Sequence, residues 1–160
     1  METNTLINEI ESVFPEVKMP EGLALSFHKN DCFECEYLRN DLEEYRGKEI
    51  SGEVIRLLHQ ELSCLSADGW RWILRHYLKF CLTPEAEYNQ METEFLIYNL
   101  GPDEKFEEGT LQRLSGLSQA QLNCIVHFLE WCAEHPFWKD YFPENIAKAL
   151  NFVQSIKAHN

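Results

Sequence analysis

The 160-residue sequence has few basic residues. It contains 14 lysines and arginines against 27 aspartates and glutamates, which gives a formal net charge of −13. Charge of this sign repels nucleic acid and anionic membranes and favours a basic partner. No apolar run approaches the roughly 18 residues of a membrane span, and no basic and apolar segments of a secretory signal open the chain. We therefore expect a cytoplasmic protein that binds neither nucleic acid nor membrane.

Motifs of the common catalytic classes are also missing. There is no glycine-rich phosphate loop, no G-x-S-x-G and no H-E-x-x-H. Cys124-x2-His127 and Cys132-x2-His135 have the residue types of nucleophile–base pairs, but no third orienting group or oxyanion-hole turn accompanies them. Among 27 carboxylates, acidic pairs arise by chance and identify no general acid or base. We nominate no catalytic residue and expect a protein that is not an enzyme.

Repeats, low-complexity tracts and Gly/Ser linkers are absent, so we expect residues 1–160 to form a single domain. A hydrophobic content of 44% is typical of a globular chain. Apolar residues recur at helical spacing almost throughout. The predicted helices lie around residues 6–14, 33–45, 51–62, 67–82, 83–100, 119–134 and 143–156, and residues 23–27 are the one candidate strand. The fold class is therefore all-α, with six or seven helices around a central aromatic helix at about 67–82.

That helix is cationic in an otherwise acidic region. Arg71, Arg75 and Lys79 occupy one arc of about 80° on a helical wheel, and apolar residues fill most of the remainder. We expect this basic stripe to meet the acidic helices on either side, with its charged heads in water. A site for an anionic ligand is the alternative, which the surrounding negative charge opposes.

Two acidic segments flank this helix along the chain. Residues 31–61 carry a net charge of −5, from nine carboxylates and four basic residues, and residues 85–108 carry −7, from eight carboxylates and one lysine. These segments supply the candidate partner-binding residues. The candidates are Glu34, Glu36, Asp41, Glu43 and Glu44 in the first segment, and Glu85, Glu87, Tyr88, Glu92, Glu94, Asp103, Glu104, Glu107 and Glu108 in the second.

Aromatic residues accompany both segments. Phe33, Tyr37, Leu38, Leu42 and Tyr45 set the apolar pattern of the helix at 33–45. In the helix at 83–100, a narrow apolar stripe runs between carboxylates; its members are Tyr88, Met91, Phe95 and Tyr98. We expect this stripe to face the core of an amphipathic helix. The alternative is a partly exposed aromatic strip rimmed by carboxylates, which would suit a basic protein partner.

Four of the six cysteines lie in or beside helical apolar patterns, as free buried thiols do; these are Cys64, Cys81, Cys124 and Cys132. Without an export signal, a reducing compartment and free thiols are expected.

His28-x3-Cys32-x2-Cys35 is the best metal candidate in the sequence. Zinc takes about four protein ligands in a structural site, and no second C-x2-C pair follows. Cys64 or Cys81 would have to complete the site from another helix. We therefore expect structural cysteines, with no metal and no cofactor.

Three blocks together resemble a family of small bacterial proteins known only as a domain of unknown function. The blocks are Tyr45-Arg46-Gly47-Lys48, Leu65-Ser66-Ala67-Asp68-Gly69-Trp70-Arg71-Trp72 and Leu117-Ser118-Gln119-Ala120-Gln121. Their order and spacing carry the resemblance, which covers roughly residues 30–135. The resemblance implies no activity and no functional residues, and the Cys32/Cys35 pair is not part of its pattern.

The sequence therefore favours a non-enzymatic, acidic binding protein with a basic protein partner. One specific form is an immunity or antitoxin-like protein that neutralises a basic bacterial toxin or effector, because toxins that act on nucleic acid need basic surfaces. Two alternatives remain: a small metal-dependent enzyme or regulator that uses His28, Cys32 and Cys35, and a housekeeping interaction module or homo-oligomer. The oligomeric state stays open.

Overall fold

Helices are the main secondary structure of the described part of the protein. The computed structural model describes the backbone of residues 1–159 and the side chains of residues 1–157. Its α-helices are α1 (Thr3–Val13), α2 (Phe33–Glu43), α3 (Gly52–Leu58), α4 (Ala67–Cys81), α5 (Pro84–Asn89), α6 (Met91–Leu100), α7 (Glu107–Leu114), α8 (Gln119–Glu134), α9 (Trp138–Tyr141) and α10 (Pro143–His159). Three 3-10 helices connect them: η1 (Gly22–Leu25), η2 (His59–Cys64) and η3 (Glu104–Phe106). The predicted all-α class is confirmed.

The number of helices exceeds the six or seven expected, because short helices fill the connectors and one predicted helix is divided. The segment 83–100 breaks at Gln90, whose φ of 67° is incompatible with a continuous right-handed helix. The candidate strand at 23–27 is wrong. Most of it forms η1, and within residues 1–159 only an isolated bridge between Ser26 and Leu65 has β pairing.

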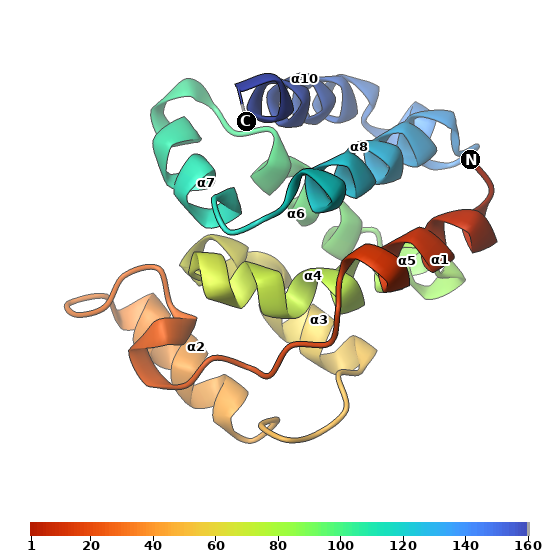
Figure 1. Cartoon of the computed structure of the whole chain (residues 1–160). Helices are drawn as coiled ribbons and strands as arrows, with labels where there is room; N and C mark the ends of the chain where they lie inside the picture. The colour runs from red at the N-terminus through yellow and green to blue at the C-terminus, as the bar shows by residue number, and fades with distance from the viewer. Residues whose placement is uncertain (160) are drawn as a thin grey trace.

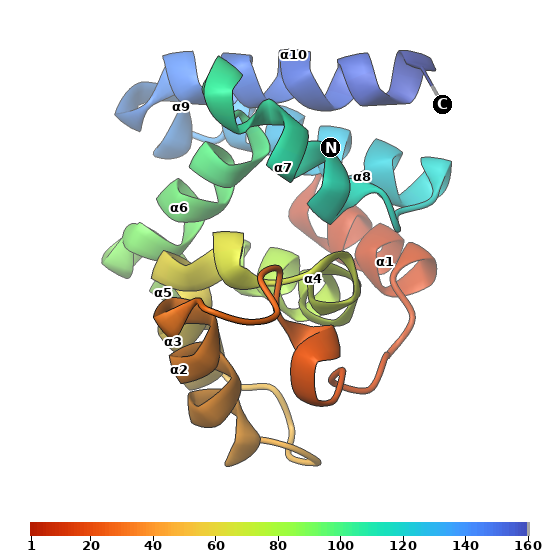
Figure 2. The same cartoon turned by 90° about the vertical axis from the view of Figure 1, so that its left-hand side faces the viewer.

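The helices form two connected layers around α4 and α6. α8 packs against both α10 and α1, while α6 contacts η2 and α10. In Figure 1 and in the perpendicular view of Figure 2, α10 lies at one end of the molecule and α2 at the opposite end. None of the helices within residues 1–159 is both long enough and apolar enough to cross a bilayer.

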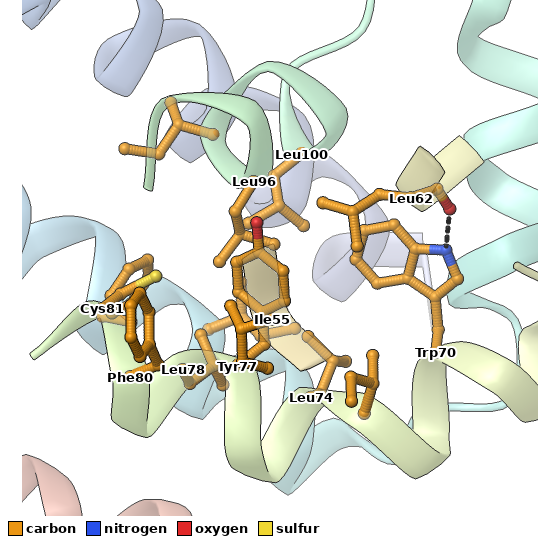
Figure 3. Packing of buried hydrophobic residues seen from close by; sticks show 14 of the residues in the cluster. Ile55, Leu62, Trp70, Leu74, Tyr77, Leu78, Phe80, Cys81, Leu96 and Leu100 are labelled. Atoms are coloured by element: carbon orange, nitrogen blue, oxygen red, sulfur yellow. Dashed lines mark hydrogen bonds between the residues drawn. The ribbon is translucent and has the colours of Figure 1, made fainter. Parts of the chain in front are cut away.

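Nine of the fifteen residues of α4 are buried, and the helix contacts α1, α3, α5, α7 and η1. Figure 3 shows its aromatic side chains among leucines from η2 and α6. The indole of Trp70 donates a hydrogen bond to the carbonyl of Leu62 at 3.1 Å, and the Tyr77 hydroxyl donates to the carbonyl of Glu92 at 2.7 Å. The polar atoms of Trp70 and Tyr77 are therefore hydrogen-bonded inside the core, which offsets the desolvation cost of burying them.

The basic stripe of α4 pairs with carboxylates, but they come from the N-terminal segment rather than from the acidic helices on either side that the sequence predicts. Lys79 pairs with Glu11 at 2.6 Å. Arg75 pairs with Glu16 at 3.6 Å and donates two hydrogen bonds to backbone carbonyls at the end of α1. Arg71 pairs within its own helix. These cations are occupied within the chain, so the stripe offers little to an anionic ligand.

The blocks that carry the family resemblance have structural roles here. Arg46 donates to the carbonyls of Met19 and Pro20, at 2.9 and 3.0 Å, and Gly47 follows with a φ of 76° that favours glycine. This turn therefore fastens the loop after α1 to the end of α2.

The other two blocks begin helices. Ser66 accepts from the Gly69 amide at 3.1 Å at the start of α4. Ser118 and Gln121 form a capping box at the start of α8. The side-chain amide of Gln121 also donates a hydrogen bond to the Val13 carbonyl at 3.0 Å. These caps satisfy backbone amides that have no partner within their helix.

Close approach of α6 and α10 generates a stability prediction. A Cβ at Gly101 would lie 2.8 Å from the Ala149 backbone nitrogen. A Cβ at Gly116 would lie 2.8 Å from the flexible Arg71 side chain, with the Ala67 Cβ at 3.9 Å in ordinary contact and no backbone atom among these neighbours. We expect Gly101→Ala to lower the free energy of unfolding by about 1–3 kcal/mol, since backbone must shift. The matched Gly116→Ala should change it by less than about 0.5 kcal/mol. Urea titrations measure both, and equal values for the two variants would contradict the predicted contact.

Candidate functional site

An exposed surface with both acidic and aromatic residues lies on α2. This helix buries only Cys35, Leu38 and Leu42, which pack toward η1 and η2. Glu34 and Glu36 lie in its first turn, where the helix dipole favours negative charge. One side of the helix is thus anchored in the core, and the other side faces solvent.

Two large aromatic side chains stand on that outward side. Phe33 is 77% exposed and Tyr37 is 66% exposed, one helical turn apart. Four exposed carboxylates surround them, and none belongs to an ion pair among residues 1–157; these are Glu34, Glu36, Asp41 and Glu44. We refer to these six residues as the α2 face. It combines unneutralised negative charge with apolar surface exposed to water.

The remaining predicted carboxylate of this segment is differently placed. Glu43 pairs with Arg46 at 2.9 Å, and this hydrogen bond holds its pKa below the ordinary value. The negative charge of Glu43 is therefore largely compensated by Arg46, in the turn after α2.

The sequence pattern placed Phe33 and Tyr37 with the apolar residues of α2, and the structure corrects this. On the helix they lie opposite Cys35, Leu38 and Leu42, in the same arc as Glu44. The acidic residues in the same arc were the sequence signal that could have identified this side of the helix as exposed. Aromatic residues alone do not identify the core side of a helix.

Part of the second acidic segment is engaged within the chain. Glu85 pairs with Arg56 and Asp103 pairs with Lys148. Glu87 lies 3.2 Å from His135, and Tyr98 donates a hydrogen bond to Glu94 at 2.7 Å. These four carboxylates are therefore less available to a partner than the carboxylates of the α2 face.

Glu92 is not available to a partner. The structure buries it, with 1% of its surface exposed, and one carboxylate oxygen has no hydrogen-bond partner. Its position on α6 brings it beneath α5, where Asn89 approaches it at 3.5 Å. Glu104, Glu107 and Glu108 do lie exposed, on η3 and the first turn of α7.

The predicted core-facing stripe of the 83–100 segment is also wrong. Tyr88 is 89% exposed, Met91 41% and Tyr98 43%. The core side of α6 consists instead of its smaller aliphatic residues; the buried residues include Leu96, Ile97 and Leu100. The alternative interpretation, an exposed aromatic strip beside carboxylates, describes this surface correctly, although those carboxylates are mostly paired.

All six cysteines are free, and only Cys32 is not buried. Burial raises the pKa of Cys124 to about 12 and raises that of Cys132 well above its ordinary value. His127 bonds to Glu9 at 2.8 Å. Thiols that stay protonated at neutral pH are poor nucleophiles, so the Cys–His spacings do not create a catalytic pair.

The structure brings the metal-candidate residues together. One ligand atom each from His28, Cys32 and Cys35 lies within 4.8 Å of the others. Cys35 is buried, and desolvation raises the pKa of its thiol. Cys64, at the end of η2, lies against this group, because its carbonyl is 3.8 Å from the Cys35 sulfur.

An open groove of about 1280 Å³ lies between the segment 16–21, the turn 45–52 and α4. Some of its ionisable groups are engaged within the chain. His76 lies 3.9 Å from Glu16, and burial lowers the pKa of His76. Lys79 pairs with Glu11. Lys18, Glu21, Lys48 and Glu49 also line the groove, so it presents charges of both signs.

Residues 2–150 match a family of unknown function, DUF6714, and the chain belongs to this family. The resemblance to a family of unknown function is thereby confirmed. No curated protein and no solved structure matches the chain significantly.

The buried thiols generate a prediction for alkaline pH. A thiol whose pKa is raised from about 8.5 in the unfolded chain contributes stability that is complete below pH 8.5 and declines as pH rises toward its folded pKa. For Cys124, that folded pKa is about 12. The free energy of unfolding should fall by about 1.4 kcal/mol per pH unit for each such thiol.

Denaturation in the presence of a chelator, between pH 9 and 11, measures this slope. Cys124→Ala should make the slope shallower by about one thiol's share. The matched variant Val126→Ala truncates another buried residue of α8 and should leave the slope unchanged. An unchanged slope in Cys124→Ala would show that this thiol ionises equally in both states.

Proposed function

We propose that this chain is a non-enzymatic binding protein whose α2 face docks a basic protein. One observation supports the proposal most directly. Phe33 and Tyr37 are exposed among four carboxylates that lack ion-pair partners within residues 1–157. In water, exposed aromatic surface of this size has no stabilising role in the monomer, whereas a partner can cover it.

The two residue types have different physical roles in such a complex. Unpaired carboxylates attract a cationic surface over about one Debye length, roughly 10 Å at 0.1 M salt, and so increase the association rate. Aromatic side chains that become buried supply most of the binding energy and slow dissociation. The α2 face has both within a single helix.

Its position also favours docking. α2 lies at the end of the molecule opposite α10, as Figures 1 and 2 show, and its outward side is not covered by another element. Because only three buried residues anchor the helix, a partner can contact the outward side without disturbing the main core.

A specific form of this function is neutralisation of a toxin or effector. A protein that acts on nucleic acid presents a basic surface to its substrate, and an acidic inhibitor can cover that surface. We propose an immunity or antitoxin-like role on this ground. The net charge of −13 is appropriate for an inhibitor that must associate rapidly.

Capture from the native host tests the binding function. The full chain, used as bait, should retain a basic protein that mass spectrometry identifies. Replacing Glu34, Glu36 and Glu44 by Gln and Asp41 by Asn should lower its association rate by roughly tenfold at low salt and flatten the salt dependence. Phe33→Ala and Tyr37→Ala should instead speed dissociation, with about a 10- to 100-fold weaker Kd.

Controls of equal charge and size separate the α2 face from general acidity. Gln at Glu104, Glu107, Glu108 and Glu130 removes four exposed charges elsewhere, and Phe106→Ala removes an aromatic residue that is 57% exposed. These variants should bind like the original chain. Retention of acidic proteins only, or equal loss in both sets of variants, would contradict the proposal.

Neutralisation has its own test. Expression of the captured partner alone should arrest bacterial growth, and coexpression of this chain should restore it. The four-charge variant of the α2 face should restore growth less well than the four-charge control, because slower association leaves the partner active for longer. A harmless partner would contradict neutralisation while leaving the binding function intact.

A further inference from the structure

The corner where η1, the start of α2 and the end of η2 meet contains four cysteine and histidine side chains. We infer that this corner is a structural zinc site, with His28, Cys32, Cys35 and Cys64 as its ligands. The inference does not rest on the proposed binding function, although Cys32 and Cys35 flank the residues that begin the α2 face.

The distances are close to those of a tetrahedral zinc centre. Bonds of about 2.3 Å to sulfur and 2.0–2.1 Å to imidazole nitrogen place neighbouring ligand atoms about 3.5–3.8 Å apart. The His28 Nδ1 and Cys35 Sγ are 3.7 Å apart, and the Cys32 ligand atom lies within 4.8 Å of both. A contraction of about 1 Å at one cysteine is therefore sufficient to give zinc geometry.

Cys64 is placed to supply the fourth ligand. The Cys35 sulfur lies 3.8 Å from the Cys64 carbonyl. The Cys64 sulfur now lies 3.5 Å from a Glu61 carboxylate oxygen. Besides the contraction at one cysteine, the site requires the Cys64 side chain to rotate away from Glu61.

Backbone hydrogen bonds already hold two of the three segments together, namely η1 with the residues after it and the end of η2. The Phe27 amide donates to the Cys64 carbonyl at 2.7 Å, and the Ser66 amide donates to the Leu25 carbonyl at 3.0 Å. Asp31 adopts a positive φ of 60° between His28 and Cys32, a conformation that is uncommon outside glycine. The loop thus turns sharply and returns Cys32 to the side of His28.

The charge around the corner also suits a zinc centre. Arg113 has no carboxylate partner among residues 1–157, although carboxylates outnumber basic residues in this chain. Its guanidinium stacks 4.1 Å from the Phe27 ring centroid, its Nε donates to the Ser63 carbonyl, and it lies near the thiols of Cys35 and Cys64. Zinc bound to three thiolates and one neutral imidazole carries a net charge of −1, which Arg113 would balance.

Binding involves no redox step. The three thiols lose their protons to solvent, three zinc–sulfur bonds form, and neutral His28 donates a nitrogen lone pair. Four protein ligands leave no open position for a substrate, so the site is structural rather than catalytic. Zinc would fix the start of α2 to the end of η2.

Metal analysis of the full chain tests the inference. The protein, purified under reducing conditions from zinc-supplemented cells, should contain about one zinc per chain. After chelation, titration with Co²⁺ should give the visible bands of a tetrahedral site and the near-ultraviolet charge-transfer band of thiolate ligands. Zinc should also protect Cys32, the partly exposed cysteine, from thiol reagents.

Matched alanine variants identify the ligands. Cys64→Ala and Cys124→Ala each truncate a buried cysteine, in η2 and α8 respectively. Cys64→Ala should weaken cobalt binding by more than about 100-fold, and Cys124→Ala should leave it unchanged. Cys32→Ala removes a partly exposed thiol and should weaken binding similarly, which keeps the test valid should Cys64→Ala not fold.

Three results would overturn the inference. The first is purified protein without zinc whose chelated form gives no tetrahedral cobalt spectrum. The second is a Cys32–Cys35 disulfide in place of metal, detected by mass spectrometry without reduction, which would assign the pair to redox chemistry. The third is binding by Cys64→Ala equal to that of Cys124→Ala, which would remove Cys64 from the ligand set.

Discussion

Burial of α4 is the constraint on which the rest of the structure depends. Nine of its fifteen residues are buried, so α1, α3, α5 and α7 must all lie against it. Trp70 and Tyr77 enter the core with their polar atoms bonded to backbone carbonyls, which makes burial of such large side chains favourable. Lys79 and Arg75, on the remaining side, fasten α1 and the segment after it.

Ion pairs within the chain determine which carboxylates keep an uncompensated negative charge. Carboxylates such as Glu11 and Asp103 pair with lysines of α4 and α10. None of the outward carboxylates of the α2 face pairs with a cation among residues 1–157. The opposite holds at its inward corner, where Arg113 lies beside thiols rather than acids. One helix thus joins an unneutralised acidic surface to a corner with the side chains of a zinc site.

Local signals predicted the helices well wherever a cap or a proline fixed an end. Ser118 with Gln121 and Ser66 with Gly69 start helices where the sequence pattern places them. The break at Gln90 had no such signal, because glutamine is a good helix former and only tertiary packing imposes its positive φ. The short connecting helices were missed for a different reason, because so few residues show too little helical periodicity.

The sequence by itself determined the all-α class, the family, the net charge and the residue types available for chemistry, because these depend on composition and on spacing along one element. Only the tertiary structure decided which side of each apolar helix is buried. It exposed Phe33 and Tyr37 while it buried Glu92. It also placed Cys64 beside Cys35, a contact between residues 29 positions apart. Helical periodicity describes neighbours within one helix, whereas contacts between helices depend on how all of them compete for the same core.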